Sequence, residues 1–339
     1  MAESDKPAGS GAPQVVGSMV GGAGGWTEGQ TITTEDARRF WGVQTFLKSQ
    51  IAQLVENPTV GFLGIPFDGG NFRTAGTRFG PRGVRTASQR MGNWSEQFEC
   101  DPHAKHRMAD FGDVIMSPFS MEEAYEAIEN AATRIYEAGA MPICIGGDHS
   151  VTLPLIRAAA KQHGPVSIVH FDAHCDVSDT AFGQPYHFGS MFRRAYEEDI
   201  VTPANVFQIG PRKFYHPGEL EFARGNYTVI TSRDLKMMGT GMRDTLRAKL
   251  APLKGTKIYC SFDIDFIDQA DAPGVGSAEP FGPNSFEALE CLRAMDEIAG
   301  DIVGMDLVEV APPFDIRDQT SYLATLILHE FVAMKPGTI

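Results

Sequence analysis

The stretch VHFDAHCDVSD, Val169–Asp179, places Asp172, His174 and Asp176 at every second position. It continues an apolar run that starts at Val166 and has the length and β-branched content of a buried strand. Because side chains of an extended backbone alternate between two faces, these three ionisable groups point the same way where the strand leaves the core. Such a row indicates a functional site at the end of this strand.

The rest of the chain alternates short apolar segments with amphipathic ones. Segments that are short, β-branched and almost continuously apolar predict strands buried on both faces, as in a parallel sheet. They occupy residues 59–66, 141–147, 166–172, 205–210, 226–231, 257–265 and 301–310. Helical periodicity marks residues 121–139, 150–163, 232–252, 285–299 and 319–335. This alternation predicts an α/β fold with three layers, α/β/α, around a central parallel sheet.

Length and composition fit one large α/β domain. The 339 residues are 42% hydrophobic and 21% charged, which is enough apolar material for a core of normal size. Residues 1–30 are rich in Gly, Ala, Ser and Pro and cannot bury enough apolar area to offset chain entropy. The expected organisation is therefore a flexible N-terminal arm over residues 1–30 and a single domain over residues 31–339.

Charge, cysteine usage and hydropathy restrict which kinds of partner and which cellular compartment are expected. A net charge of −14 disfavours nucleic acid and anionic membrane surfaces, and it is compatible with a cationic substrate or with simple solubility. Five cysteines at irregular spacing predict neither a disulfide framework nor a zinc motif, and they favour a reducing compartment, the cytoplasm. The sequence has no run of 18 apolar residues and no signal-peptide pattern, so neither a membrane span nor secretion is expected.

Polar clusters follow four of the predicted strands. They are GGDHS at 146–150, DAHCD at 172–176, DID at 263–265 and DLVEV at 306–310. The carboxyl ends of parallel strands meet at one edge of the sheet, where ligands of such folds bind. We therefore expect this edge to collect the side chains of His149, Asp172, His174, Asp176, Asp263, Asp265 and Glu309.

This set of side chains predicts a metal centre. Converging carboxylates repel one another and are costly to bury unpaired, and no matching group of Arg or Lys follows these strands. Carboxylate and imidazole ligands suit Mn²⁺, Ni²⁺, Co²⁺ or Fe²⁺, and six of them are too many for one such ion. Two ions about 3.5–4 Å apart are therefore expected. A lone DxHxD could instead be a solvated turn, but separate clusters that each end a strand argue against that alternative.

The motifs GGDHS, HFDAHCD and SFDIDFIDQADAPGVGSAEP together resemble the signatures of the ureohydrolase family, the arginases, agmatinases and their relatives. The resemblance covers residues 55–335 and points to the agmatinase-like branch. It implies an arginase-like fold, trimers or hexamers of identical or different subunits, and two metal ions per subunit, Mn²⁺ or Ni²⁺, that hydrolyse a guanidino group to urea and an amine. The ligands it implies are His149 and Asp176 for one ion, His174 and Asp265 for the other, and Asp172 and Asp263 as bridges.

The resemblance also implies catalytic and substrate-binding roles. Asp176 would hold the tetrahedral intermediate, and Glu309 would pair with the planar guanidinium. Most relatives carry a proton-shuttling histidine where this chain has Phe188, and the chain has His187 one position earlier, so His187 is the candidate for that role. Phe188 makes the substrate pocket more apolar. The segment DVSD replaces the DTW or DTY of many agmatinases and adds Ser178 to the predicted substrate contacts.

Three functions remain open on the sequence alone. The first is an amidinohydrolase of the agmatinase or guanidinobutyrase type that acts on a small guanidino substrate. The second, suited to a more apolar pocket, is a hydrolase of small or N-alkylated guanidines or biguanides. Family members of this type favour nickel. The third is a non-catalytic partner subunit of a hetero-oligomer, for which the displaced histidine argues and against which the complete ligand set argues. A deacetylase site with one zinc is disfavoured because such sites use fewer carboxylates.

Overall fold

The computed structural model describes residues 42–336, and the account below concerns the compact unit that begins at Thr45. The expected arm over residues 1–30 lies outside the described residues. The division into this arm and one domain over residues 31–339 therefore stays a prediction.

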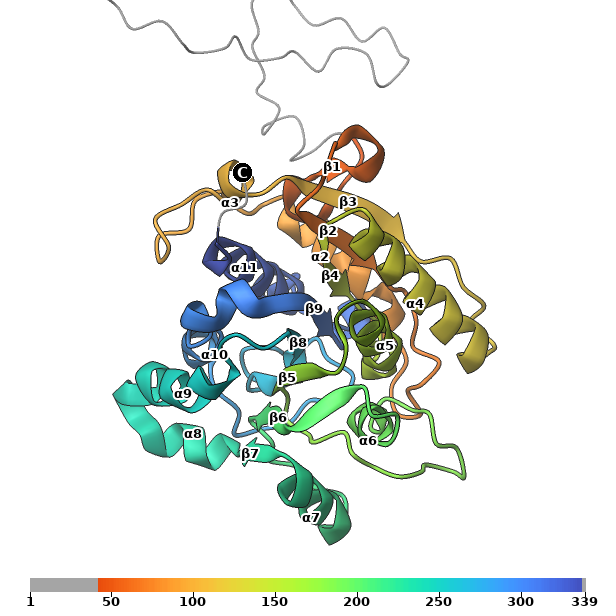
Figure 1. The fold of residues 1–339 in the computed structure, drawn as a ribbon, viewed down its shortest axis with the longest axis vertical. Coiled ribbons are helices and arrows are strands. Elements are labelled where there is room, and N and C mark those ends of the chain that lie inside the picture. The colour runs from red at the N-terminus through yellow and green to blue at the C-terminus, as the bar shows by residue number, and fades with distance from the viewer. Residues whose placement is uncertain (1–41, 337–339) are drawn as a thin grey trace, which may run out of the picture. The chain divides into compact units, whose positions relative to one another are not determined.

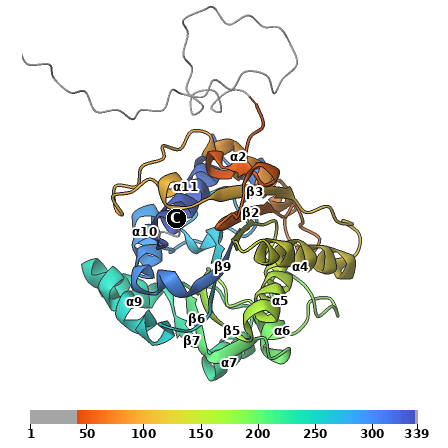
Figure 2. The same ribbon diagram turned by 45° about the horizontal axis from the view of Figure 1, so that its top comes forward.

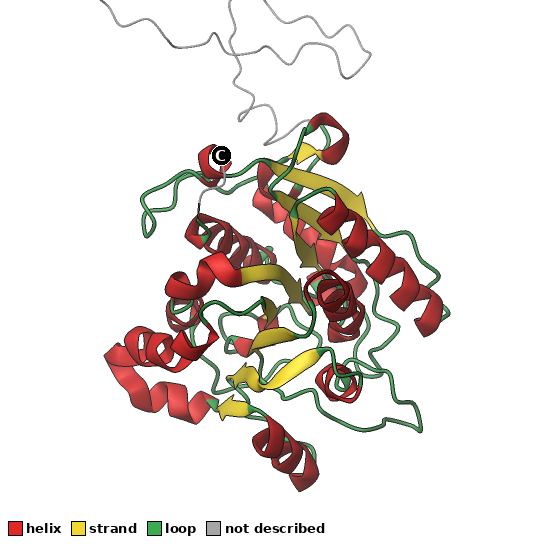
Figure 3. Cartoon of the chain, in the orientation of Figure 1, coloured by secondary structure: helices red, strands yellow, loops and turns green. Residues whose placement is uncertain are grey.

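Parallel strands form a nine-stranded sheet in the described part of the chain (Figure 3). Their order is β1-β3-β2-β4-β9-β8-β5-β6-β7, and every neighbouring pair is parallel. The strands are β1 Gln50–Ile51, β2 Val60–Gly64, β3 Met108–Asp113, β4 Met141–Ile145, β5 Val166–Phe171, β6 Val201–Ile209, β7 Thr228–Ile230, β8 Ile258–Asp263 and β9 Ile302–Val308. The predicted central parallel sheet is thus confirmed.

Helices cover both faces of the sheet (Figures 1 and 2). One layer contains α4, α5, α6 and α7, and the other contains α2, α8, α9, α10 and α11. The helices are α2 Gly80–Ser88, α3 Pro102–Lys105, α4 Met121–Glu137, α5 Thr152–His163, α6 Met191–Glu197, α7 Pro217–Asn226, α8 Ser232–Met238, α9 Met242–Leu250, α10 Ser285–Arg293 and α11 Gln319–Met334. Between residues 42 and 336, no helix is long and apolar enough to cross a membrane.

Local sequence explains where these helices begin. Before α4, the Ser120 hydroxyl accepts a hydrogen bond from the Glu123 N–H at 3.2 Å, and two glutamates occupy the first turn. Both features stabilise a helix N-terminus, because they satisfy a free N–H and oppose the helix dipole. Before α10, Asn284 and Glu287 form a reciprocal capping box. These signals agree with the helices that the periodicity predicts.

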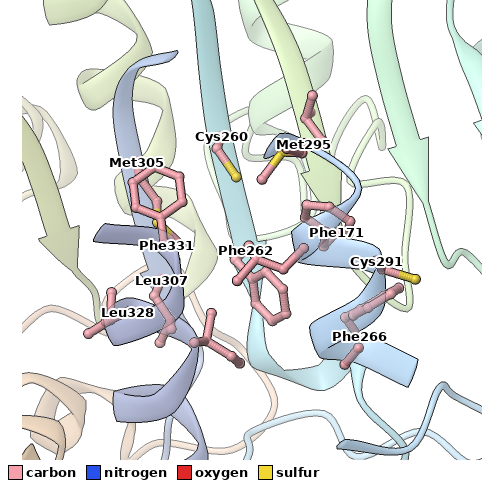
Figure 4. Packing of buried hydrophobic residues seen from close by; sticks show 14 of the residues in the cluster. Phe171, Cys260, Phe262, Phe266, Cys291, Met295, Met305, Leu307, Leu328 and Phe331 are labelled. Atoms are coloured by element: carbon pink, nitrogen blue, oxygen red, sulfur yellow. The ribbon is translucent and has the colours of Figure 1, made fainter. Parts of the chain in front are cut away.

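A tightly packed aromatic group lies directly beneath the strand ends (Figure 4). The ring centroids of Phe171 and Phe262 are 5.2 Å apart, and Phe266 lies 5.3 Å from Phe171 and 5.6 Å from Phe262. All three side chains are fully buried. Phe171 precedes Asp172 and Phe262 precedes Asp263, so the polar residues follow a close-packed and therefore rigid base.

Some elements were not predicted by the sequence patterns. Strand β3 reads MADFGD, and its Asp110 and Gly112 interrupt the apolar run that would indicate a strand. Asp110 is nevertheless buried, because its carboxylate accepts the Phe46 N–H at 2.9 Å and pairs with Arg85 Nε at 3.1 Å. The helix predicted over 232–252 is divided into α8 and α9 by Gly239, which has a φ of 56°. The short strand β1 and the helices α6 and α7 were also missed.

Candidate metal centre

The four polar clusters follow four adjacent central strands, β4, β9, β8 and β5 (Figure 1). The chain forms β4, continues to β5 and the far edge of the sheet, and then returns to insert β8 and β9 between them. Their carboxyl ends therefore lie side by side at the point where the strand order changes direction, which is where open α/β sheets bind ligands. The predicted meeting of these clusters at one edge is confirmed.

His149 lies at the centre of the first group of ligand atoms. Its Nδ1 atom is 2.9 Å from Asp176 Oδ2, 3.0 Å from Asp172 Oδ2 and 3.2 Å from Asp263 Oδ2. The His149 side chain is fully buried, and Nδ1 has no hydrogen-bond partner of good geometry. One ring nitrogen carries at most one proton and cannot match three carboxylate oxygens. A divalent cation fits this arrangement, because it binds the nitrogen lone pair and neutralises the carboxylates.

His174 marks a second group beside the first. Its Nδ1 lies 3.1 Å from Asp172 Oδ1 and 3.2 Å from Asp265 Oδ2. Asp172 therefore directs one oxygen to each histidine, which is the geometry that a bridging carboxylate requires. Asp263 Oδ2 faces His149, whereas its Oδ1 accepts the Asp265 N–H at 2.8 Å. The bridging roles of Asp172 and Asp263 both stay predictions.

Excess negative charge dominates the electrostatics of these groups. Burial raises the pKa of Asp176 to about 7, and the nearby Asp172 adds to the rise. Burial also raises the pKa values of Asp263 and Asp265, with further contributions from neighbouring carboxylates. Burial alone would lower the pKa of His149, but the carboxylates around Nδ1 raise it well above its ordinary value. Each of these shifts favours protonation, and a bound cation would supply the same positive charge. Asp172 differs, because the histidines that face it outweigh the effect of burial and lower its pKa.

Unusual backbone conformations position two of the predicted residues. Asp176 has a φ of 51° and Glu309 a φ of 66°, in the left-handed region that residues other than glycine adopt uncommonly. Such strain concentrates at functional sites and persists only where surrounding structure holds it. Before His149, Gly147 passes so close to Phe67 that a Cβ atom would lie 1.6 Å from the Phe67 carbonyl oxygen. Only glycine fits at that position.

Four side chains that the sequence patterns did not assign support the ligand atoms. His170 Nε2 is 2.8 Å from Asp172 Oδ2, and Arg212 donates to the Asp265 carbonyl at 2.8 Å. The Ser261 hydroxyl donates to Asp306 Oδ1 at 2.7 Å and lies 2.9 Å from His149 Nε2. His170 could have been found from its period of two with Asp172, whereas the other contacts join residues far apart in the sequence.

The Ser261–Asp306 pair fixes the tautomer of His149. Because the Ser261 hydroxyl gives its proton to Asp306, it accepts one from His149 Nε2, and in the neutral ring this leaves Nδ1 with a free lone pair. The arrangement is that of an outer hydrogen bond that orients a metal-binding histidine.

Replacing Ser261 by alanine is therefore expected to weaken metal binding roughly 10–100-fold without unfolding the chain. Competition with a chelator measures the affinity directly. The matched control is Ser167→Ala. Ser167 lies near the N-terminal end of β5, whereas the predicted ligands follow its C-terminal end, and its hydroxyl donates only to Thr256, at 2.9 Å. Equal affinities for the two variants would remove Ser261 from the positioning of His149.

Glu309 combines one satisfied oxygen with one free oxygen. Its Oε1 accepts the His149 N–H at 2.8 Å, whereas Oε2 is buried without a partner. Burial raises the pKa of Glu309 well above its ordinary value, and the nearby Asp148 adds to this rise. Oε2 lies 3.0 Å from the place that a Cβ on Gly276 would occupy, and Asn71 Nδ2, also unpartnered, lies 3.3 Å from the same place. A side chain at Gly276 would therefore crowd the free oxygen of Glu309.

The other predicted substrate contacts have different surroundings. The Ser178 hydroxyl donates to Glu219 Oε1 at 2.5 Å, so that hydrogen is already in use. His187 is buried, and its Nδ1 accepts the Gly189 N–H at 3.1 Å. The backbone N–H of Phe188 donates to the Gly70 carbonyl at 3.1 Å. The substrate roles of Ser178, His187 and Phe188 stay predictions.

Comparison with known proteins agrees with this geometry. The model of the arginase family matches residues 58–334. Guanidinobutyrase from Pseudomonas aeruginosa is 36% identical over 317 residues, which cover 91% of this chain and 98% of the relative. Guanidinopropionase from the same organism is 34% identical over 307 residues, 90% of this chain and 95% of the relative. The structure of proclavaminate amidino hydrolase from Streptomyces clavuligerus superposes with a TM-score of 0.81 at 34% identity and covers 87% of this chain and 98% of that chain. The resemblance and the arginase-like fold are thereby confirmed, and this chain belongs to the arginase family.

Proposed function

We propose that this chain is a metal-dependent amidinohydrolase that converts a small guanidino compound and water into urea and an amine. The reaction breaks one guanidino C–N bond and forms one C–O bond, and the positive charge of the guanidinium leaves on the protonated amine. The observation that carries the proposal is the free, buried Glu309 Oε2 beside a group of carboxylates and imidazoles suited to divalent cations. Similar proteins named guanidinobutyrase and guanidinopropionase support it.

The residues that would hold the metal ions are His149, Asp172, His174, Asp176, Asp263 and Asp265. When bound, two Mn²⁺ or Ni²⁺ ions supply Lewis acidity and lower the pKa of a water molecule, so that it is nucleophilic at neutral pH. The protein's own contribution is to hold the guanidinium carbon in the correct place and orientation.

Glu309 and Asp176 are the residues that would orient the substrate. A carboxylate matches the planar N–H fork of a guanidinium, and Oε2 of Glu309 is free to accept from it. Because Oε1 is fixed by the His149 N–H, the carboxylate cannot turn away from this position. Asp176 uses Oδ2 toward His149, so Oδ1 is the atom left to accept a hydrogen bond from an amidino nitrogen at the attacked carbon.

His187 would act as a hydrogen-bond donor in place of the proton-shuttling histidine of most relatives. Its Nδ1 accepts the Gly189 N–H, so the neutral ring carries its proton on Nε2, which is buried without a partner. Burial lowers the pKa of His187 to about 4, and the charge of Arg194 adds to the effect. A histidine with this pKa is neutral above about pH 5 and does not change charge between pH 6 and 9.

Replacing His187 by alanine is expected to lower kcat about tenfold with metal content unchanged, because one neutral hydrogen bond is lost. His187→Gln, which keeps an N–H donor, should retain more activity than the alanine variant. The pH–rate profiles of both variants between pH 6 and 9 should have the shape of the wild-type profile. If His187 instead transfers a proton to the leaving amine, the glutamine variant will be as slow as the alanine variant. An inflection present in the wild-type pH–rate profile will then be absent from the profiles of both variants.

A substrate panel tests the proposed function. Wild-type protein reconstituted separately with Mn²⁺ and with Ni²⁺ would be incubated with 4-guanidinobutyrate, agmatine, arginine, guanidine, N,N-dimethylguanidine and metformin. Urea (guanylurea in the case of metformin) and the released amine would be measured. Release of both products in equal amounts from at least one compound is expected. Metal-loaded, folded protein that releases neither product from any of them would contradict the proposal and favour the non-catalytic partner subunit.

A group of aromatic rings supports a second candidate, hydrolysis of small or N-alkylated guanidines or biguanides. The Phe72 ring lies 5.0 Å from Phe188, 5.3 Å from Phe182 and 5.8 Å from His187 between centroids. Phe72 follows Asn71, which flanks the free oxygen of Glu309, and the side chains of Phe72 and Phe182 are 50% and 87% exposed. Exposed rings beside the site would favour apolar substituents. A highest kcat/KM for dimethylguanidine or metformin in the panel would select this candidate.

Assembly is also proposed from the family resemblance, and location from the cysteine usage of the sequence. We expect a trimer or hexamer, of one chain type or of two, located in the cytoplasm. Size-exclusion chromatography with light scattering on purified full-length protein measures the assembly.

A further inference from the structure

An arginine without an acidic partner lies beside the candidate centre. Arg73 is exposed, and its guanidinium carbon lies 4.7 Å from the centroid of the Tyr215 ring. Its Nη1 donates to the Ser277 hydroxyl at 3.4 Å. Within residues 42–336, no carboxylate forms an ion pair with Arg73. The nearby Glu279 lies 3.7 Å from His174 Nε2, and the interaction with His174 lowers the pKa of Glu279, a shift to which the more distant charge of Arg73 adds. The positive charge of Arg73 is therefore available to a ligand.

The contacts of Arg73 place it next to the residues that line the centre. The Tyr215 hydroxyl is 3.3 Å from His174 Nε2, and the two rings are nearly parallel, at 11°. Ser277 follows Gly276, which lies against Glu309 Oε2. The guanidinium of Arg73 is thus held by Tyr215 and Ser277. Tyr215 contacts the predicted metal ligand His174, and Ser277 is adjacent to Gly276, which lies against Glu309.

The two free charges of this region have opposite signs. Glu309 supplies a buried negative charge, and Arg73 supplies an exposed positive charge two residues after Asn71, which flanks Glu309 Oε2. A compound with a cationic guanidinium at one end and a carboxylate at the other complements this pair of charges. A diamine-derived guanidine would bring its ammonium close to Arg73.

We propose that Arg73 binds the distal carboxylate of an ω-guanidino acid while Glu309 pairs with its guanidinium, so that Arg73 determines specificity for guanidino acids. This inference rests on the proposed function, because it concerns the substrate of the same site. Arg73 suits the task, since its planar fork makes two parallel hydrogen bonds to a carboxylate. In this arrangement the methylene chain of the substrate passes the rings of Phe72 and Phe188.

Three substrates with three methylene groups each and different terminal groups test the proposal. They are 4-guanidinobutyrate, N-butylguanidine and N-(3-aminopropyl)guanidine, whose tails are negative, neutral and positive. The full-length, metal-loaded wild type would be compared with Arg73→Gln and with Arg134→Gln, a matched control at an exposed arginine of α4. Both kcat and KM would be measured for each substrate.

Wild-type protein and the Arg134 control are expected to prefer the guanidino acid. Arg73→Gln should lower kcat/KM for the acid by roughly 10–100-fold, because one charge-assisted contact is lost. The loss should be mainly in KM, because the contact is the same in the ground and transition states. For the neutral substrate kcat/KM should change by less than about threefold, and for the cationic substrate it should stay or rise, because a repulsive charge is removed.

Two results would overturn the role of Arg73. One is an equal loss for all three substrates, which would mean that Arg73 only supports the fold of the site. The other is an Arg73→Gln variant whose kcat/KM for the guanidino acid falls no more than its kcat/KM for the neutral substrate. A wild type that hydrolyses N-butylguanidine but not the guanidino acid would overturn the role in the same way. Failure of the proposed function is different, because wild-type protein would then hydrolyse none of these compounds and none of the wider panel.

Discussion

Replacing Asp263 by alanine is expected to abolish turnover and to lower the metal content of the protein. Asp263 Oδ2 is one of three carboxylate oxygens around His149 Nδ1, and its Oδ1 accepts the Asp265 N–H. The substitution therefore removes one ligand atom and releases the backbone that carries another. Because residues that merely orient a ligand cost 10–100-fold in affinity or activity, the loss here should exceed about a hundredfold.

Elemental analysis and a urea assay on the same preparation measure both effects. The matched control is Asp244→Ala on α9, where the side chain is 83% exposed. Thermal unfolding checks that both variants retain the fold in the presence of metal. Full turnover by the Asp263 variant would show that this carboxylate is not a ligand, whatever the behaviour of its neighbours.

Replacing Glu309 by glutamine is expected to lower kcat/KM for guanidino substrates by roughly 100–1,000-fold while metal content stays at the wild-type level. Glutamine keeps an oxygen that can accept the His149 N–H, so the loop after β4 should keep its position. At the Oε2 position, however, an NH₂ group would face the guanidinium in place of a negative charge. The loss includes a buried charge-assisted hydrogen bond and the cost of an unpaired donor.

The metal measurement separates two possible causes of a defect at Glu309. Normal metal content with low kcat/KM identifies Glu309 as a substrate contact. Loss of metal together with activity would mean that Glu309 acts through His149, because their contact would then be the essential one. A kcat/KM within about threefold of wild type would exclude the guanidinium pairing altogether. Glu129→Gln on α4 is a suitable surface control.

Much of the fold could be predicted because buried parallel strands have a strong sequence signature. The segments at 141–147, 166–172 and 257–265 are almost uninterrupted apolar runs, and each contains a strand of the observed sheet. Strand β3 escaped because Asp110 is satisfied by Arg85 and the Phe46 N–H, contacts that no local pattern reveals. The order of the strands was also beyond local patterns, since β8 and β9 insert between β4 and β5.

The candidate site was predictable where ionisable residues follow strands at a spacing of two. That spacing gave Asp172, His174 and Asp176 and the pair at 263 and 265, and the structure brings them together. Ser261 and Asp306 were missed because each lies inside a strand and acts through a partner on the neighbouring strand. Local sequence also could not reveal that Ser178 is occupied by Glu219, 41 residues later in the chain.

The central claim is that acidic and imidazole side chains at the ends of three strands, β4, β5 and β8, bind two divalent cations. Full-length protein would be stripped of metal, reconstituted with Mn²⁺ or Ni²⁺, freed of loosely bound ions and analysed for metal per chain. The account predicts about two ions per wild-type chain, and fewer in the Asp263→Ala variant. Folded wild-type protein that retains no metal would contradict it, because the carboxylates around His149 would then be balanced by protons alone.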